Sequence, residues 1–333
     1  MAIERNVHKT VDGMASVPYE QLSRMRYNMS APFPRISVVT PCLNGSLFIE
    51  EAIQSVLDQD YPNVEHIIVD GGSTDGTLEL IKKYPHLRVI SEPDQGLYDA
   101  LNKGVRLSTG DIIGHLNCDD FYEKRTFGRV CKAFMDSPAI EAVCGGVEVF
   151  EHGKNGVTRV IAQYMRPVDL ELSFENVTTG PAMTNSRFFR KSVYERIGLY
   201  EPRFRIAADR EFLIRAALAR IQSIGIETVL YHYRAHAGSL TFSPRSPHRL
   251  RTLNEFLEIA EAHIPTDGGV DVIEPFCREW HARTAAEATM RALRERSYTL
   301  ALNYAKRGST YKPSWPLTFM TIFFRRIMTG KSH

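Results

Sequence analysis

The stretch DIIGHLNCDD, from Asp111 to Asp120, decides how the rest of this chain is interpreted. Its β-branched pair, Ile112 and Ile113, predicts a buried strand, and two adjacent carboxylates, Asp119 and Asp120, follow that strand. Adjacent carboxylates repel each other, and they become favourable when a hard divalent cation lies between them and an anionic ligand. The segment therefore predicts a metal-bound phosphate compound. The alternative is a solvated turn or a helix N-cap before Phe121.

The composition is typical of a soluble globular protein. Of the 333 residues, 24% are charged and 43% are hydrophobic, and the net charge of +2 argues against a nucleic-acid-binding surface. The five cysteines are scattered and never spaced C-x-x-C, which indicates reduced thiols in the cytoplasm and no zinc site. We expect no signal peptide and no transmembrane helix, because no apolar run approaches the ~20 residues that a bilayer requires.

The first half of the chain alternates strand and helix patterns. Short apolar runs at 35–40, 64–70, 88–91 and 111–116 predict four strands, the first stopped by Pro41. Apolar residues at helical spacing predict helices near 49–57, 77–84 and 97–105. This alternation is typical of βαβ units, so the predicted fold is α/β with a mostly parallel central sheet flanked by helices.

Polar and glycine residues follow three of these strands. They are Thr40, Pro41 and Asn44 after the first, Asp70, Gly72 and Ser73 after the second, and Asn117 with the acidic pair after the fourth. Parallel strands place such loops on one edge, where Asp70 can accept hydrogen bonds from a nucleobase or a ribose. Neither of the first two loops reads G-x-G-x-x-G, so a dinucleotide dehydrogenase is not expected.

Four motifs in fixed order resemble one family: 36–41 (ISVVTP), 69–77 (VDGGSTDGT), 92–104 (EPDQGLYDALNKG) and 109–114 (TGDIIG). Together they resemble the family 2 glycosyltransferases of GT-A fold, and 92–104 is most similar to members that build bacterial exopolysaccharides and O-antigens. The resemblance covers roughly residues 34–242. It implies a hexosyltransferase that takes a sugar from a nucleotide-diphosphate donor, UDP by default, and inverts the anomeric configuration.

The resemblance also implies roles for particular residues. Pro41 and Asn44 match positions that line the nucleoside, and Asp70 matches a base-binding aspartate. Thr40, Gly72 and Ser73 are expected to bind the donor with them, and Asn102 and Lys103 lie in a stretch near it. Asp119 matches the last acid of the family's D-x-D, which reaches the Mn²⁺ or Mg²⁺ cofactor, whereas Asn117 replaces the first acid.

The second half carries the residues expected at the reacting end. Asp209, in the segment AADREFL, matches the catalytic base, although an ordinary helix N-terminal acid is the alternative and Glu211 is the next candidate. His236, in YRAHAGS, is a candidate metal ligand beside Asp119 and Asp120, or else a surface-loop histidine. Arg234 could pair with phosphate, and 180–185 is expected to border the acceptor. The Q-x-x-R-W signature of processive members is missing, so one sugar per acceptor is expected.

We expect three regions: an N-terminal extension at 1–34, a GT-A domain at 35–242 and a helical C-terminal region at 243–333. Helices are predicted at 250–263 and 275–306, and they pack on the catalytic domain or form a homodimer. The tail at 315–328 is apolar and basic, which suits either a membrane interface or docking on the protein itself. Interface binding would fit a glycan or lipid-linked acceptor on the inner face of the plasma membrane. Two alternatives remain: a nucleotide-sugar-binding subunit without activity, and a sugar nucleotidyltransferase.

Overall fold

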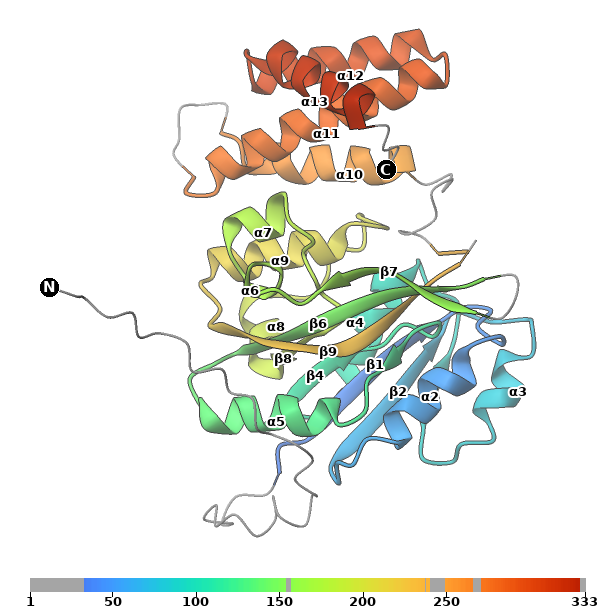
Figure 1. The fold of residues 1–333 in the computed structure, drawn as a ribbon. Coiled ribbons are helices and arrows are strands. Elements are labelled where there is room, and N and C mark those ends of the chain that lie inside the picture. Colours follow the sequence, from blue (N-terminus) through green and yellow to red (C-terminus); the bar gives the residue numbers. More distant parts are fainter. Residues whose placement is uncertain (1–32, 154–156, 237, 240–248, 266–270, 330–333) are drawn as a thin grey trace, which may run out of the picture. The chain divides into compact units, whose positions relative to one another are not determined.

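The protein is described by a computed structural model that covers residues 33–153, 157–236, 238–239, 249–265 and 271–329. The N-terminal extension and the 243–247 linker therefore lie outside the described residues, apart from Phe33 and Pro34. The described residues from Pro34 to Thr329 belong to one compact unit. Its centre is a nine-stranded sheet with helices on both faces, as Figure 1 shows.

The first half of the sheet is parallel, as the alternating pattern predicted. Strands β3 (Arg88–Ser91), β2 (Val64–Asp70), β1 (Ile36–Cys42) and β4 (Ile112–His115) lie side by side in that order. The pairs Ile36 with Val64 and Ile36 with Ile112 set the register on the two sides of β1. Parallel strands in this order bring the loops after β1, β2 and β4 to one edge.

The second half of the sheet is mixed, which the sequence patterns did not reveal. Strand β8 (Arg187–Arg190) is antiparallel to β4 and to β6 (Ala142–His152). Strand β9 (Ser223–Ala235) is parallel to β6, and β5 (Phe121–Tyr122) and β7 (Thr158–Tyr164) pair antiparallel with β9 and β6. Long strands β6 and β9 thereby extend the sheet beyond the predicted parallel part.

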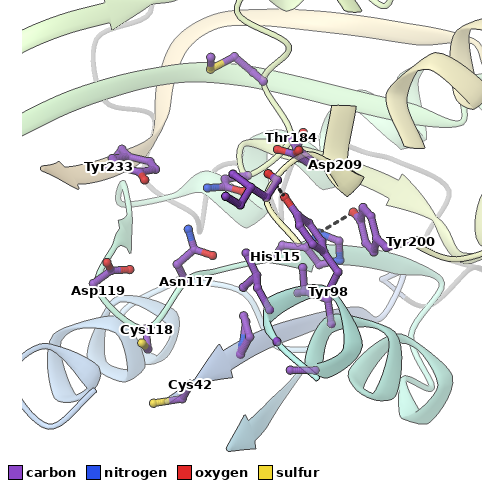
Figure 2. A pocket seen from close by; sticks show the side chains of 18 of the residues that line it. Cys42, Tyr98, His115, Asn117, Cys118, Asp119, Thr184, Tyr200, Asp209 and Tyr233 are labelled. Atoms are coloured by element: carbon purple, nitrogen blue, oxygen red, sulfur yellow. Dashed lines mark hydrogen bonds between the residues drawn. The ribbon is translucent and has the colours of Figure 1, made fainter. Parts of the chain in front are cut away.

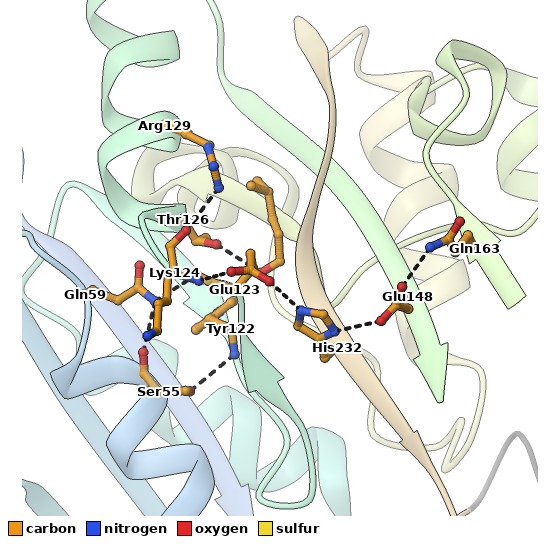
Figure 3. Close-up of polar contacts among 11 residues, drawn as sticks. Ser55, Gln59, Tyr122, Glu123, Lys124, Thr126, Arg129, Glu148, Gln163 and His232 are labelled. Carbon is orange, nitrogen blue, oxygen red and sulfur yellow. Dashed lines mark hydrogen bonds and ion pairs between the residues drawn. The ribbon is translucent and has the colours of Figure 1, made fainter. Parts of the chain in front are cut away.

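Polar side chains connect four strands of this mixed half (Figure 3). The His232 ring on β9 lies 2.9 Å from the Glu123 carboxylate, just after β5, and 3.3 Å from the Glu148 carboxylate on β6. Gln163 on β7 donates a hydrogen bond of 2.7 Å to Glu148. These contacts fix neighbouring strands whose backbone register changes along their length.

Helices cover both faces of the sheet and bury alternate residues of its strands. Val39 of β1 belongs to a core formed with α4 (Leu97–Leu107), α8 (Lys191–Ile197) and α9 (Ala208–Leu218). Val38, one residue earlier, belongs to a second core formed with α2 (Ile49–Leu57) and α5 (Thr126–Asp136). The period of two in β1 thus separates the cores. Three short helices, α3 (Thr77–Ile81), α6 (Pro167–Leu170) and α7 (Phe174–Thr178), complete this part.

Strand β1 does not stop at Pro41, contrary to the prediction. The Val39 carbonyl accepts a hydrogen bond from the Leu116 N–H, so the N position of Pro41, two residues on, faces the same neighbour, β4. The last pair between β1 and β4 is Val39 with His115, and β4 has therefore ended where Pro41 lies. A missing N–H costs no hydrogen bond in the ladder at that point, and β1 continues to Cys42.

The C-terminal region is helical, as predicted, with α10 (Arg249–Ala262), α11 (Glu274–Arg294), α12 (Tyr298–Tyr311) and α13 (Trp315–Thr329). The single helix expected at 275–306 is wrong, because Arg296 has a φ of +57° and ends the helical backbone there. Ile259 of α10 and Trp280 of α11 belong to the same core as Phe212 of α9, so these helices pack on the catalytic part of the chain.

Helix α13 is docked on one side only. Trp315, Phe319 and Ile322 pack with the core of the C-terminal helices, and the Trp315 indole N–H donates to the Ala282 carbonyl at 3.0 Å. Leu317 and Met328 are 72% and 84% exposed. Among the described helices, none combines the length and the apolar character needed to cross a bilayer.

Candidate active site

A cavity of about 610 Å³ opens at the edge of the sheet where the strand loops meet. Its walls come from the ends of β1 and β4, the first turns of α4 and α9, strand β6 and the loop at 181–185. Figure 2 shows Asp119 and Asp209 on different sides of this space, with Asn117 and His115 between them. Two of the three predicted strand-end loops, those after β1 and β4, and the predicted acceptor loop thus border one cavity.

Asp119 and His236 form one end of the site. The Asp119 Oδ2 and His236 Nε2 atoms are 2.8 Å apart, although 117 residues separate them in the chain. Both side chains are partly exposed, at 27% and 29%. Strand β9 brings His236 there, because its final residues run beside the loop that carries the acidic pair. An oxygen and a nitrogen ligand are therefore available to a cation.

Asp120 has a different environment from Asp119. Its carboxylate is buried and accepts hydrogen bonds from the Tyr231 hydroxyl at 2.6 Å, the Arg234 N–H at 2.8 Å and the Asn117 side chain at 2.9 Å. Burial, with the neighbouring Asp119 charge, raises the pKa of Asp120. These contacts occupy both oxygens, so the structure does not support the expected metal ligation by Asp120; the residue fixes the loop instead.

Arg234 does not face the cavity as a phosphate ligand, contrary to the expectation. Its buried guanidinium pairs with Glu51, donates to the Asp119 carbonyl at 2.8 Å and lies over the rings of Phe48 and Phe150. These partners use its donors and shield its charge. Arg234 therefore holds the backbone of Asp119.

Asp209 lies at the other end of the cavity, in the first turn of α9. Burial raises the pKa of its carboxyl group, while the Arg210 charge and N–H and a hydrogen bond from Tyr98 lower that pKa in part. Glu211, the other candidate base, forms a two-pronged ion pair with Arg215 at 2.7 and 2.8 Å and does not line the cavity. Of the two acids, Asp209 alone is placed to meet a ligand there.

Several residues that were expected to bind the donor form hydrogen bonds within the protein instead. Asp70 is buried and accepts hydrogen bonds from the Gly72 and Ser73 N–H groups and the Ser91 hydroxyl, and it does not line the cavity. Thr40 is buried against His66 at 2.8 Å. The Asn44 side chain accepts from the Thr74 N–H, and its own N–H donates to Ser73. Pro41 and Asn117 do line the cavity.

Asn102 and Lys103 also lie outside the cavity lining. The buried Asn102 amide exchanges two hydrogen bonds with the backbone of Tyr200, at 2.8 and 2.9 Å. Lys103 forms ion pairs with Glu92 and Asp99 and donates to the Pro93 carbonyl. The expectation of direct donor binding is not supported for either residue. Asn102 instead positions Tyr200, which lines the cavity.

Sequence reasoning missed Asp94, Tyr98, His115 and Tyr200, all of which line the cavity. The Tyr200 hydroxyl lies 3.1 Å from His115 Nδ1, and a Cβ atom on Gly71 would meet the Asp94 carboxylate at 2.6 Å. Asp94 and Tyr98 belong to the quoted stretch 92–104, which was the available signal. His115 belongs to the quoted stretch 111–120, which gave it the same kind of signal, whereas Tyr200 had none, because only the fold brings it to the cavity.

Comparisons with known proteins identify the family of this chain. The sequence model of "Glycosyl transferase family 2" matches residues 37–198. A PGL/p-HBAD biosynthesis glycosyltransferase of Mycobacterium bovis is 33% identical over 189 residues, which is 55% of this chain and 69% of that protein. The chain belongs to glycosyltransferase family 2. The alternative of a sugar nucleotidyltransferase therefore finds no support, and the protein is a glycosyltransferase.

Solved structures show that this family 2 glycosyltransferase has the GT-A fold. Residues 1–349 of Staphylococcus aureus TarS in complex with UDP-GlcNAc align with a TM-score of 0.56 at 16% identity, over 85% of this chain and 92% of that one. The Pyrobaculum calidifontis mannosyltransferase PcManGT in complex with GDP-Man and Mn²⁺ aligns with a TM-score of 0.53 at 20% identity, over 91% and 93%.

A divalent cation fits part of this glycosyltransferase's site. Among the described residues, no group of three or more histidine, cysteine, aspartate or glutamate side chains is arranged around one point. Asp119 and His236 provide two converging ligands of the kinds that Mn²⁺ accepts. Oxygens of a bound diphosphate are the natural source of the remaining ligands.

Proposed function

We propose that this enzyme is an inverting, non-processive glycosyltransferase that moves one sugar from a UDP-sugar to a hydroxyl of a glycan or lipid-linked acceptor in cell-surface polysaccharide synthesis. The observation that supports this most is that two acidic side chains lie apart from each other in one cavity. Asp119 lies on one side of the cavity and Asp209 on another (Figure 2). His236 does not line the cavity itself but contacts the Asp119 carboxylate from behind the lining, at 2.8 Å. A donor diphosphate at Asp119 and an acceptor hydroxyl at Asp209 would place the sugar between them.

The reaction is a single displacement. The acceptor oxygen attacks the anomeric carbon, the bond from that carbon to the diphosphate oxygen breaks, and the acceptor proton passes to Asp209. Attack from the face opposite the leaving group inverts the configuration. Asp119 and His236 would hold a divalent cation, which would neutralise charge on the departing diphosphate. General-base assistance of this kind contributes roughly 10²–10⁴-fold to the rate.

The local chemistry of Asp209 supports its assignment as the base. A base needs a pKa near the working pH, and burial raises the pKa of Asp209 from the usual aspartate range. The Tyr98 hydroxyl and the Arg210 N–H also bind the carboxylate and fix its position. One oxygen accepts the Arg210 N–H at 2.7 Å, while the side chain still lines the cavity.

Part of the wall on the expected acceptor side of the cavity is apolar, although Thr184 and Asn185 also line it. Val147 and Val149 of β6, Tyr164 of β7 and Met183 of the 181–185 loop line it. Such a wall suits an acceptor that carries an apolar group next to its hydroxyl, as a lipid-linked acceptor does. We also propose that the exposed apolar side of α13 holds the enzyme at the inner face of the membrane, where such an acceptor would reside.

The experiment that tests this function is calorimetric titration of UDP-, GDP- and dTDP-sugars into the full chain with Mn²⁺, Mg²⁺ or EDTA. We expect one UDP-sugar to bind the enzyme in the presence of Mn²⁺ or Mg²⁺ and to lose most of its affinity in EDTA. Binding of no donor under any condition would contradict the proposal. It would favour a degenerate or partner-dependent subunit, for which Asn117 in place of an acid is the supporting feature.

A further inference from the structure

A glutamate of the C-terminal helices holds the start of the helix that carries Asp209. Glu255 of α10 accepts hydrogen bonds from three successive backbone N–H groups, those of Arg205 at 3.1 Å, Ile206 at 2.8 Å and Ala207 at 2.9 Å. Glu255 is only 7% exposed. Three donors on one shielded carboxylate make a strong contact between segments about 50 residues apart in the chain.

Helix α9 has no side-chain cap of its own. Its N-cap residue is Ala207, and alanine has no side-chain oxygen with which to accept a hydrogen bond from the first turn. The N–H groups at a helix start require acceptors, and a negative charge there is favourable. Glu255 accepts from the N–H group of this N-cap residue and from those of the two residues before it, and its charge lies beside the helix start. The C-terminal region therefore completes an element of the catalytic part.

Residues 205–207, which Glu255 binds, lead directly into the site. Asp209 follows Ala207 by two residues. The Tyr98 hydroxyl donates to the Ile206 carbonyl at 3.0 Å, and the same hydroxyl contacts the Asp209 carboxylate. The segment at 205–207 is thus held by Glu255 through its N–H groups and by Tyr98 through a carbonyl. A shift of this segment would move the Asp209 carboxylate.

A second contact reaches the same turn from the C-terminal helices. The Arg210 guanidinium lies 5.0 Å from the ring centre of Phe256 on α10 and 5.5 Å from that of Trp280 on α11. It donates to the carbonyls of Val177 and Thr178, at 3.0 and 2.7 Å, just before the acceptor loop at 181–185. Residues on both sides of Asp209 therefore depend on α10 and α11.

We propose that Glu255 is a positioning residue, which fixes the catalytic base Asp209 from the C-terminal region by holding residues 205–207 at the entry to α9. This inference rests on the proposed role of Asp209. Because the held segment leads into Asp209, and its Ile206 lines the cavity, loss of Glu255 should lower kcat, while donor binding at the Asp119 end should stay unchanged. Misplacement of a catalytic group by about 1 Å can cost on the order of 100-fold in rate.

The test compares full-chain variants by the rate of UDP release from the UDP-sugar that titration identifies. Glu255→Ala is expected to lower kcat by roughly 10- to 100-fold with KM for the donor within about twofold of wild type. Glu255→Gln keeps the volume and one acceptor oxygen, so it should retain an intermediate kcat. It also serves if the alanine variant fails to fold.

The matched control is Glu261→Gln on the same helix. Glu261 binds His281 at 2.8 Å and pairs with Arg307, all within the C-terminal helices. This variant should lower the melting temperature and leave kcat at the wild-type value, which separates loss of stability from loss of positioning.

Asp209→Asn distinguishes the two ways in which the account could fail. If Asp209→Asn is inactive while Glu255→Ala keeps wild-type kcat, the inference about Glu255 is overturned and the proposed function stands. If Asp209→Asn keeps wild-type turnover, the proposed base is wrong. An equal loss of kcat in Glu261→Gln would also overturn the specific role of Glu255.

Discussion

Two opposing influences act on the pKa of Asp209, and their balance determines its chemistry. Burial favours its neutral form and raises its pKa, whereas Arg210 and the Tyr98 hydroxyl favour the carboxylate. The result is an acid with a raised pKa that is still held in one position. An exposed aspartate has neither feature, so the environment of Asp209 distinguishes it from an ordinary first-turn acid.

The first prediction concerns the pH dependence of kcat. A base must be ionised, and a raised pKa means that ionisation is lost at a higher pH than the usual aspartate value of about 3.9. The acid limb of the kcat profile should therefore lie above that value. In Tyr98→Phe the hydrogen bond that lowers the pKa of Asp209 is removed, so the limb should move to still higher pH. A limb that stays in place or moves to lower pH would contradict this account.

The second prediction concerns the metal end of the cavity. Asp119→Ala removes the carboxylate that lies 2.8 Å from His236, so donor affinity should no longer depend on Mn²⁺. His236→Ala should weaken Mn²⁺-dependent affinity at least about tenfold, since a ligand is lost. The control is Glu123→Gln, four residues after Asp119 and outside the cavity lining, and this variant should bind the donor with wild-type affinity. Tight Mn²⁺-dependent binding by Asp119→Ala in calorimetry would exclude this role.

At the scale of single residues, the sequence predicted which regions lie at the cavity better than it predicted the role of each side chain. Asp119 and Asp209 line the cavity, and His236 contacts Asp119, as the motifs suggested. Asp70 and Asn102 were expected at the ligand and are instead buried in the protein, outside the cavity lining. Their partners, such as Tyr200 for Asn102, lie up to 98 residues away, and a motif does not reveal which side of a loop a carboxylate or amide will face.

At the scale of elements, close packing of helix on strand fixes the floor of the site. Gly104 of α4 lies against Val39 of β1, and a Cβ atom at this position would overlap the Val39 side chain. Helix α4 also carries Tyr98, which contacts Asp209, so its distance from the sheet matters for the chemistry. Here the glycine is required for close approach and not for a turn.

The third prediction tests this packing with a matched pair of glycines. Gly104→Ala should lower the free energy of unfolding by about 1–3 kcal/mol, because the added methyl group forces α4 away from β1. Gly128→Ala, at an exposed position of α5 with open space around it, should raise that free energy by up to roughly 1 kcal/mol. Urea unfolding measures both. Equal effects of the two substitutions would show that the close approach at Gly104 is unimportant.

Elements with clear periodicity were predicted well, and those that depend on distant partners were not. The ranges of β2 and β3 agree with the apolar runs. The end of β1 was misplaced because whether a proline breaks a ladder depends on where the neighbouring strand stops. The break at Arg296 was missed because a positive φ at arginine leaves no compositional signal.

At the scale of the whole chain, the helical C-terminal region has two different surfaces. Helices α10 and α11 share a core with α9, whereas α13 leaves Leu317, Phe324 and Met328 exposed. Sequence reasoning left docking and membrane contact open as alternatives for the tail, and α13 docks through one side. The mixed second half of the sheet was not predictable, because β6 and β9 pair across about 80 residues.

The fourth prediction follows from that exposed side. Liposomes with anionic headgroups should carry the full chain upward in a flotation gradient, and a variant with Leu317, Phe324 and Met328 changed to serine should stay at the bottom. Phe319, which packs with Trp315, is left intact so that the fold of the region is kept. Equal flotation of the two proteins would exclude α13 as the membrane contact.

The central claim is that Asp209 is the base of a transfer whose donor is held at the opposite end of the cavity. Turnover and donor binding of Asp209→Asn, measured together with the preferred UDP-sugar, test it most directly. The account predicts that UDP release falls roughly 10²–10⁴-fold while the dissociation constant for the donor stays unchanged. Near wild-type turnover, or a loss of donor binding equal to the loss of rate, would contradict it.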